Sequence, residues 1–259
     1  MDPRYYKPLN RVERSISYVV LAFTALACII FFCLLNRTHV HGWLNFSRRK
    51  PVLLLPNHTT MIDSFLVEVF AGFPWALVRP GMLAYHPAAA ENFFSHPVLA
   101  WFSRMWRCIP VNHTRKDPTA MRLMATVLAT NPLVVFPAGT RSRDGSVGRG
   151  RPGVGRLILD TQPVVVPVYI AGMGAVLPIG KRVPRLFKRL DIYFACPIDF
   201  SAHECSSNDR DTSRKIIDRV MDEICRMQEA HLARRPAAPC SPRPSFSLAR
   251  LRRFGGRGE

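Results

Sequence analysis

The sequence predicts an α/β fold, in which a mostly parallel, mixed sheet is layered with helices and preceded by an N-terminal transmembrane helix. Three observations predict this fold. Short apolar runs bounded by Pro or Gly recur after residue 50, and they suit strands that are buried on both faces. Helix-length segments separate several of these runs, as in a sheet covered by helices. A long stretch without charge precedes them all.

Three helices and six strands are expected after this stretch. A helix is expected at 62–71, and another at 118–130, where apolar residues recur at helical spacing. A late amphipathic helix is expected at 211–232, because Ile216, Val220 and Ile224 recur every four residues. The expected strands are 52–55, 75–78, 108–111, 133–136, 164–170 and 190–195.

The stretch 15–35, which precedes all these elements, contains no charged residue and is long enough to cross a hydrocarbon core of about 30 Å. A cleaved signal peptide and a buried core helix are the competing interpretations. Basic residues flank the stretch on both sides, so the positive-inside rule gives no clear orientation. We expect a membrane anchor at 1–40, one catalytic domain at 41–233, and a basic tail at 234–259 whose composition cannot bury a core.

Charge and cysteine usage limit the partners. A net charge of +18 indicates a surface that attracts anions, which include nucleic acid, anionic lipid headgroups and phosphorylated small molecules. The seven cysteines and eight histidines show no metal-ligand spacing, so no metal site is expected. We interpret the cysteines as reduced thiols, which predicts a cytoplasmic or inner membrane with the catalytic domain on the cytosolic side. Three isolated histidines are assigned no role beyond surface or packing: His86, His96 and His113.

A first motif stands where the apolar run 52–55 ends and the helix at 62–71 begins. It reads Pro-Asn-His-Thr-Thr-Met-Ile-Asp and contains Asn57, His58 and Asp63. Ligands of open α/β sheets bind at this end of the strands. A continuous helix would not bring positions five apart together, so a turn must bring Asp63 to His58. A carboxylate on one ring nitrogen would leave the other free to accept a proton from a hydroxyl, although such a pair also arises often by chance.

A second motif follows the apolar run at 133–136, where a turn rich in glycine, hydroxyl groups and arginine begins. Backbone N–H groups near Gly139, the Thr140 hydroxyl and the Arg141 guanidinium are suited to hold a phosphate. Composition alone equally allows an ordinary basic surface loop.

Together the two motifs resemble those of the glycerolipid acyltransferase family, which includes 1-acylglycerol-3-phosphate and lysophospholipid acyltransferases and, more distantly, tafazzin. The NHxxxxD block of that family is met by Asn57, His58 and Asp63. Arg115 occupies the place of the arginine in the family's second block. Its FPEGTRS block is met by six of seven residues: Phe136, Pro137, Gly139, Thr140, Arg141 and Ser142.

One residue departs from the family pattern, because Ala138 stands where the family usually has a glutamate. If that glutamate orders the phosphate-binding arginine, its absence weakens the site or changes which acceptor fits. Asp144 is the nearest acidic substitute. Because His58 and Asp63 are intact, we favour an active enzyme.

The resemblance implies an acyltransferase without a cofactor. His58 would be the base and Asp63 its orienting carboxylate, and Arg141 and Arg115 would hold the acceptor phosphate. The substrate-binding residues would be Arg141, Gly139, Thr140, Ser142, Arg115 and Asn57. The co-substrate would be acyl-CoA or acyl-carrier protein, and the acceptor a lysophosphatidic-acid-type lipid in the membrane. A lysophospholipid remodelling enzyme or transacylase is the alternative within this class. A non-catalytic protein that binds anionic lipid or nucleic acid is the alternative outside it, although no specific nucleic-acid module is recognisable.

Overall fold

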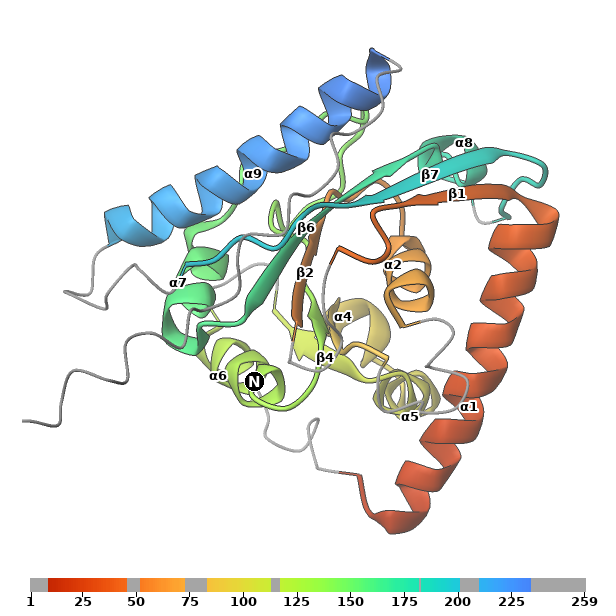
Figure 1. The fold of residues 1–259 in the computed structure, drawn as a ribbon. Coiled ribbons are helices and arrows are strands. Elements are labelled where there is room, and N and C mark those ends of the chain that lie inside the picture. The colour runs from red at the N-terminus through yellow and green to blue at the C-terminus, as the bar shows by residue number, and fades with distance from the viewer. Residues whose placement is uncertain are drawn as a thin grey trace, which may run out of the picture.

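The computed structural model describes residues 9–45, 52–72, 83–112, 117–181, 183–200 and 210–233. It shows the expected sheet layered with helices on both faces (Figure 1). The elements, in chain order, are α1 (Arg11–Ile29), η2 (Ile30–Leu35, a π-helical turn), β1 (Arg37–His41), β2 (Val52–Pro56), α2 (Asp63–Gly72), β3 (His86–Ala89), α4 (Ala90–Phe93), α5 (Pro97–Met105), β4 (Cys108–Val111), α6 (Pro118–Leu128), β5 (Leu133–Val134), α7 (Pro152–Thr161), β6 (Val164–Ala171), α8 (Met173–Val176), β7 (Arg189–Phe194) and α9 (Arg210–Leu232).

The main sheet has the strand order β1-β7-β6-β2-β5. The pairs β1–β7, β6–β2 and β2–β5 are parallel, while β6 and β7 are antiparallel, so the sheet is mixed and mostly parallel as expected. A second sheet pairs β3 with β4 in parallel. The parallel pairing places the carboxyl ends of β2, β5 and β6 at one edge, and the loops after these strands meet there.

Both faces of the sheet are buried, and β2 shows this residue by residue. Leu53 and Leu55 pack with α6, α7 and α9, whereas Val52 and Leu54 pack with α2, α8 and the end of the first helix. Successive side chains of a strand point to opposite faces, so an unbroken apolar run is what two buried faces require. Figure 1 shows α7 and α9 on one side of the sheet and α2 on the other.

The apolar N-terminal helix lies along the domain. From Arg11 to Leu35 it is long and apolar enough to cross a membrane, and 17% of its most apolar window is buried. One face contacts the end of α5 and the residue that follows it: Ser17 Oγ donates to the Met105 carbonyl (2.7 Å), and Trp106 Nε1 donates to Thr24 Oγ1 (2.9 Å). The chain then enters β1, so the expected end of the anchor at residue 40 falls inside a strand of the main sheet.

Several expectations can be compared with these elements. The helices expected at 62–71, 118–130 and 211–232 are present as α2, α6 and α9, and the strands expected at 52–55, 108–111, 164–170 and 190–195 are present as β2, β4, β6 and β7. The strand expected at 133–136 ends after Val134, and β1 and β3 were not expected. The strand expected at 75–78 and the tail at 234–259 lie outside the described residues.

The interpretation of all cysteines as reduced thiols is wrong at Cys196, which forms a disulfide. Cys28, Cys33, Cys108 and Cys225 are free thiols. Disulfides are typical of oxidising compartments, so cysteine usage does not support a cytosolic catalytic domain.

Candidate active site

His58 and Asp63 meet through the turn between β2 and α2. The Nδ1 atom of His58 lies 3.0 Å from Oδ2 of Asp63, the first residue of α2. The Asp63 side chain is fully buried, whereas 19% of the His58 side chain is exposed. The carboxylate therefore occupies Nδ1 and leaves Nε2 as the ring nitrogen for a substrate.

The Asp63 carboxylate is fixed from several directions. Its Oδ2 accepts hydrogen bonds from the backbone N–H groups of Thr59 (2.6 Å) and Thr60 (2.8 Å), and its Oδ1 accepts one from the Thr60 hydroxyl. These donors satisfy the oxygens of the buried carboxylate, and they close the turn that carries the histidine. The His58 ring also stacks on Phe136, with centroids 3.9 Å apart. The imidazole is therefore held by both a buried carboxylate and an aromatic face.

Asn57 holds this turn to the sheet. Its Nδ2 donates to the Ile170 carbonyl (3.0 Å), and its Oδ1 accepts from the Ile170 backbone N–H (2.7 Å). The residue is 6% exposed, and it lies next to the cavity beside His58. Because both ends of its amide bind β6, Asn57 positions this turn, and the substrate contact that the sequence suggested stays a prediction.

The second motif forms a tight turn against the first. Gly139 has φ +69°, and its N–H donates to the Phe136 carbonyl (3.0 Å). A Cβ at this position would come within 2.4 Å of Nε of Arg151. The left-handed conformation therefore favours glycine, and a larger residue would also have to displace the flexible Arg151 side chain. Farther along the same loop, the backbone N–H of Ser142 donates to the His58 carbonyl (2.7 Å), so the loops of the two motifs are joined directly.

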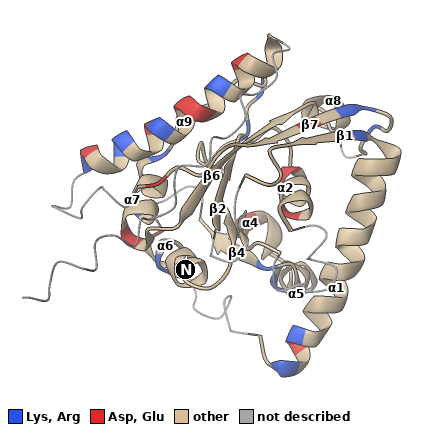
Figure 2. Cartoon of the chain, viewed as in Figure 1, with Lys and Arg blue, Asp and Glu red and all other residues tan. Residues whose placement is uncertain are grey.

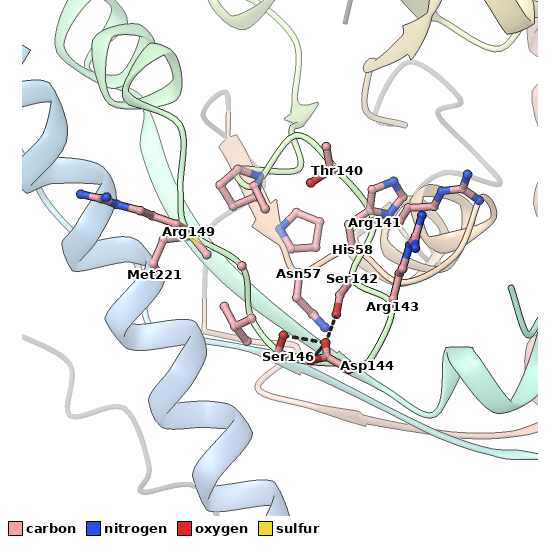
Figure 3. A pocket seen from close by; sticks show the side chains of 15 residues that line it. Asn57, His58, Thr140, Arg141, Ser142, Arg143, Asp144, Ser146, Arg149 and Met221 are labelled. Atoms are coloured by element: carbon pink, nitrogen blue, oxygen red, sulfur yellow. Dashed lines mark hydrogen bonds between the residues drawn. The ribbon is translucent and has the colours of Figure 1, made fainter.

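A cavity of about 240 Å³ opens between these loops. Figure 3 shows Arg141 and Arg143 on the His58 side of this cavity, whereas Arg149 lies across it beside Met221 of α9. All three arginines lie at the surface. A site with one imidazole and several guanidinium groups is suited to an anionic molecule that carries a hydroxyl. The cavity is lined by His58, Asn57, Thr140, Arg141, Ser142 and further residues of the two loops.

Asp144 does not replace the missing glutamate as a partner of Arg141. Its carboxylate accepts hydrogen bonds from Ser146, through both the hydroxyl and the backbone N–H, and from the Ser142 hydroxyl. These bonds lower the pKa of Asp144 to about 2, the contacts with Ser146 contributing most. The carboxylate is therefore ionised at neutral pH and braces the loop. Ala138 itself lines the cavity, and its carbonyl accepts a hydrogen bond from Arg151.

The structure thus brings together all but one of the residues singled out from the sequence. Arg115 lies outside the described residues. Phe136 was matched only as part of a motif, and its stacking on the histidine was not foreseen. Within the described parts of the chain, no group of three or more His, Cys, Asp or Glu is arranged to hold a metal.

Fold and site define an α/β protein with a histidine–carboxylate pair beside an arginine-rich loop. The chain belongs to the glycerolipid acyltransferase family: the family model described as Acyltransferase matches residues 37–171, which run from β1 to the end of β6. This match includes both motifs and the strands that precede them.

Curated relatives share the central part of the chain. The chloroplastic 1-acyl-sn-glycerol-3-phosphate acyltransferase of Brassica napus is 27% identical over 152 residues, which cover 56% of this chain and 40% of that protein. The chloroplastic enzyme of the same description from Arabidopsis thaliana is 25% identical over 153 residues, which cover 56% and 39%. The chain therefore spans about 40% of the length of these relatives.

The fold is similar to that of a solved structure, the 1-acyl-sn-glycerophosphate (LPA) acyltransferase PlsC from Thermotoga maritima. The two share a TM-score of 0.55 and 20% sequence identity, and the match covers 85% of this chain and 86% of that chain. This similarity confirms the α/β fold.

Proposed function

We propose that this protein transfers a fatty acyl group from an acyl thioester to the free hydroxyl of a lysophosphatidic-acid-type lipid. The observation that carries the proposal is the 3.0 Å contact between His58 and Asp63 at the rim of a cavity that Arg141 also lines. The names of the curated relatives, all 1-acyl-sn-glycerol-3-phosphate acyltransferases, support the acceptor class.

In this mechanism His58 is the general base. Its Nε2 removes the proton from the acceptor hydroxyl as the oxygen attacks the thioester carbonyl, and Asp63 stabilises the imidazolium that forms. The carbon–sulfur bond then breaks, and the imidazolium returns the proton to the thiolate that leaves. The acyl group passes directly from donor to acceptor, so no residue of the chain needs to carry it.

Arg141 holds the acceptor by its phosphate. Because the Ser142–His58 hydrogen bond fixes one loop to the other, a phosphate bound at Arg141 places the rest of the molecule at a defined distance from the imidazole. Arg143 adds positive charge on the same side of the cavity. A guanidinium can bind two phosphate oxygens at once, which fixes orientation as well as position.

The N-terminal helix associates the enzyme with the membrane that contains its substrates. The face of this helix that points away from the domain is apolar, with Val19, Phe23 and Leu34 exposed by 63%, 75% and 74%. Val98 and Phe102 of the neighbouring helix α5 are exposed as well. Apolar surface of this extent is typical of a membrane contact. Figure 2 shows the length of α1 without charge beyond its first turns.

The experiment supplies the full chain, reconstituted in phospholipid vesicles, with lysophosphatidic acid and a labelled acyl donor. Acyl-CoA and acyl-carrier protein are tested in separate reactions, because the site does not distinguish the two thioesters. We expect labelled phosphatidic acid with at least one donor and none with His58→Ala. Binding of lysophosphatidic acid without product from either donor would instead indicate a lipid-binding protein.

A further inference from the structure

The segment between α8 and β7 exposes apolar and basic side chains in alternation. Ile179, Val183 and Phe187 are exposed by 59%, 79% and 75%. Lys181 and Arg185, which stand between them, are exposed too. We call these five residues the α8–β7 rim. Three large exposed apolar side chains so close together do not stabilise a loop in water. Such a cluster is typical of an interaction surface.

Phe187 is held in a strained conformation. Its φ is +60°, in the left-handed region that bulky residues rarely adopt. The backbone is fixed there by a hydrogen bond from the Phe187 N–H to the Leu35 carbonyl (2.7 Å). The surrounding structure thus maintains an unfavourable backbone while the phenyl ring stays in solvent. Such strain persists where a side chain serves a function.

The rim is fastened to the end of the apolar N-terminal helix. Besides the Phe187–Leu35 bond, the Lys188 N–H donates to Asn36 Oδ1 (2.9 Å), and the Arg37 N–H donates to the Lys188 carbonyl (2.8 Å). Figure 1 shows β7 beginning beside the end of this helix, and Figure 2 shows basic residues at the same place. Wherever the helix meets a bilayer, the rim is close to the surface of that bilayer.

We propose that the α8–β7 rim is a second membrane contact, in which the three apolar side chains enter the lipid interface and Lys181 and Arg185 bind anionic headgroups. The proposal rests on the membrane association of α1 described above. A bilayer that contains anionic lipid matches both features of the rim, because it offers an apolar interior beneath a layer of negative charge.

A second cavity lies between this surface and the active site. It measures about 350 Å³, and its lining includes Ile179 and Lys181 of the rim together with Thr59 and Arg141. Arg141 also lines the cavity beside His58, so its side chain borders both spaces. A rim docked on the bilayer places the mouth of the second cavity at the lipid surface. A lysolipid phosphate then has a short path from the membrane to Arg141.

The test places a tryptophan on the rim of the full chain. Val183→Trp is reconstituted in vesicles of phosphatidylcholine and phosphatidylglycerol, with and without lipids brominated along the acyl chain, and the emission of the wild type is subtracted. We expect the added emission to be blue-shifted and quenched by bromine. The matched control is Leu232→Trp, at an exposed position of α9 on the other face of the sheet, where we expect no quenching.

Two further variants, each built on Val183→Trp, separate membrane contact from folding. Phe187→Gly removes the ring and suits the positive φ, so we expect Tm to hold or rise while the bromine quenching of the introduced indole falls. Replacing Lys181 and Arg185 by glutamine should abolish the increase in quenching, about twofold, that phosphatidylglycerol produces over pure phosphatidylcholine. Unchanged quenching in both variants would refute the roles assigned to these side chains.

A tryptophan on the N-terminal helix, Phe23→Trp, distinguishes failure of the rim contact from failure of the membrane association of α1. Quenching at residue 23 without quenching at residue 183 overturns the rim and leaves the association of α1 intact. Quenching at neither position overturns the membrane association as a whole. Acyl transfer to lysophosphatidic acid is measured separately and decides the enzymatic proposal alone.

Discussion

The backbone N–H of Ser142 donates a 2.7 Å hydrogen bond to the carbonyl oxygen of His58. The two residues are far apart in the sequence, yet this bond makes their loops one structure. One loop carries the imidazole and its buried carboxylate, and the other carries the arginine-rich turn. The backbone of the arginine-rich turn is therefore held at a fixed distance from the backbone that carries the imidazole.

The first prediction concerns the carboxylate. In Asp63→Asn one oxygen is replaced by a nitrogen that cannot accept hydrogen bonds, so the ring loses its ionised partner while the shape of the side chain is kept. We expect kcat to fall by about 10²- to 10⁴-fold with little change in the KM for lysophosphatidic acid. Initial rates of labelled acyl transfer measure this split.

A matched control for this substitution is Asp160→Asn, on the exposed side of α7. Asp160 pairs only with Arg156 one helical turn before it among the described residues. We expect wild-type rates from the control, and circular dichroism should show both variants folded. A folded Asp63→Asn protein with wild-type kcat would disprove the role of the dyad.

The second prediction concerns acceptor binding. Arg141→Lys keeps the charge but loses the planar fork, so we expect the KM for lysophosphatidic acid to rise about tenfold or more while the KM for the acyl donor changes less. The control is Arg156→Lys, where a solvent-exposed ion pair contributes little. A larger effect on the donor KM than on the acceptor KM would show that Arg141 binds the donor.

The third prediction concerns packing of α7 on α9. A Cβ on Gly155 would lie 1.9 Å from the Ser213 carbonyl oxygen, which is backbone and cannot rotate away. We expect Gly155→Ala to lower the free energy of unfolding by about 1–3 kcal/mol, since the helices must separate. Gly153→Ala in the same helix meets nothing within 4 Å, so stability should hold or increase. Thermal unfolding of both variants distinguishes a steric effect of the α7–α9 contact from an effect of helix propensity.

The sequence predicted the parts of the fold that depend on local pattern. The run of apolar residues in β2 follows from burial on both faces, and the amphipathic spacing of α9 from one buried face. β1 was missed because its sequence, Arg-Thr-His-Val-His, has little apolar character, and it is a strand because β7 offers a free edge. A strand that forms because a neighbouring strand pairs with it leaves no signal in its own sequence.

The site was predicted to a similar degree. The contact between His58 and Asp63 could be anticipated because a turn was the single way to join residues five apart. The two hydrogen bonds from the Asn57 amide to Ile170 of β6 could not be anticipated, because they depend on which strand lies next to β2. The disulfide at Cys196 was also beyond reach, since cysteine pairing depends on tertiary distance rather than spacing.

His86 was assigned no role beyond surface or packing, but it lies in a buried polar network with Glu68 of α2 and Cys108 of β4. Its Nδ1 is 2.6 Å from Glu68 Oε1, and its Nε2 is 3.2 Å from Cys108 Sγ. Nδ1 of His86 and Oε1 of Glu68 are close together, but their arrangement does not satisfy hydrogen-bond geometry. We therefore interpret the contact as a charge pair. Burial alone would lower the pKa of His86, but the interactions with Cys108 and Glu68 together raise it well above its usual value of 6.5.

The last prediction follows from the sign of this shift. A histidine whose pKa is higher in the folded state contributes stability that is fully present below its unfolded pKa, near 6.5, and is lost as the pH rises through the folded pKa. Glu68→Gln removes the charged partner at nearly constant volume. We therefore expect the variant to lose about 3 kcal/mol of unfolding free energy near pH 6, and the deficit to shrink as the pH rises above 6.5. Denaturant unfolding of both proteins across this range measures the difference, and a deficit that grows with pH would show that His86 is neutral in the folded protein.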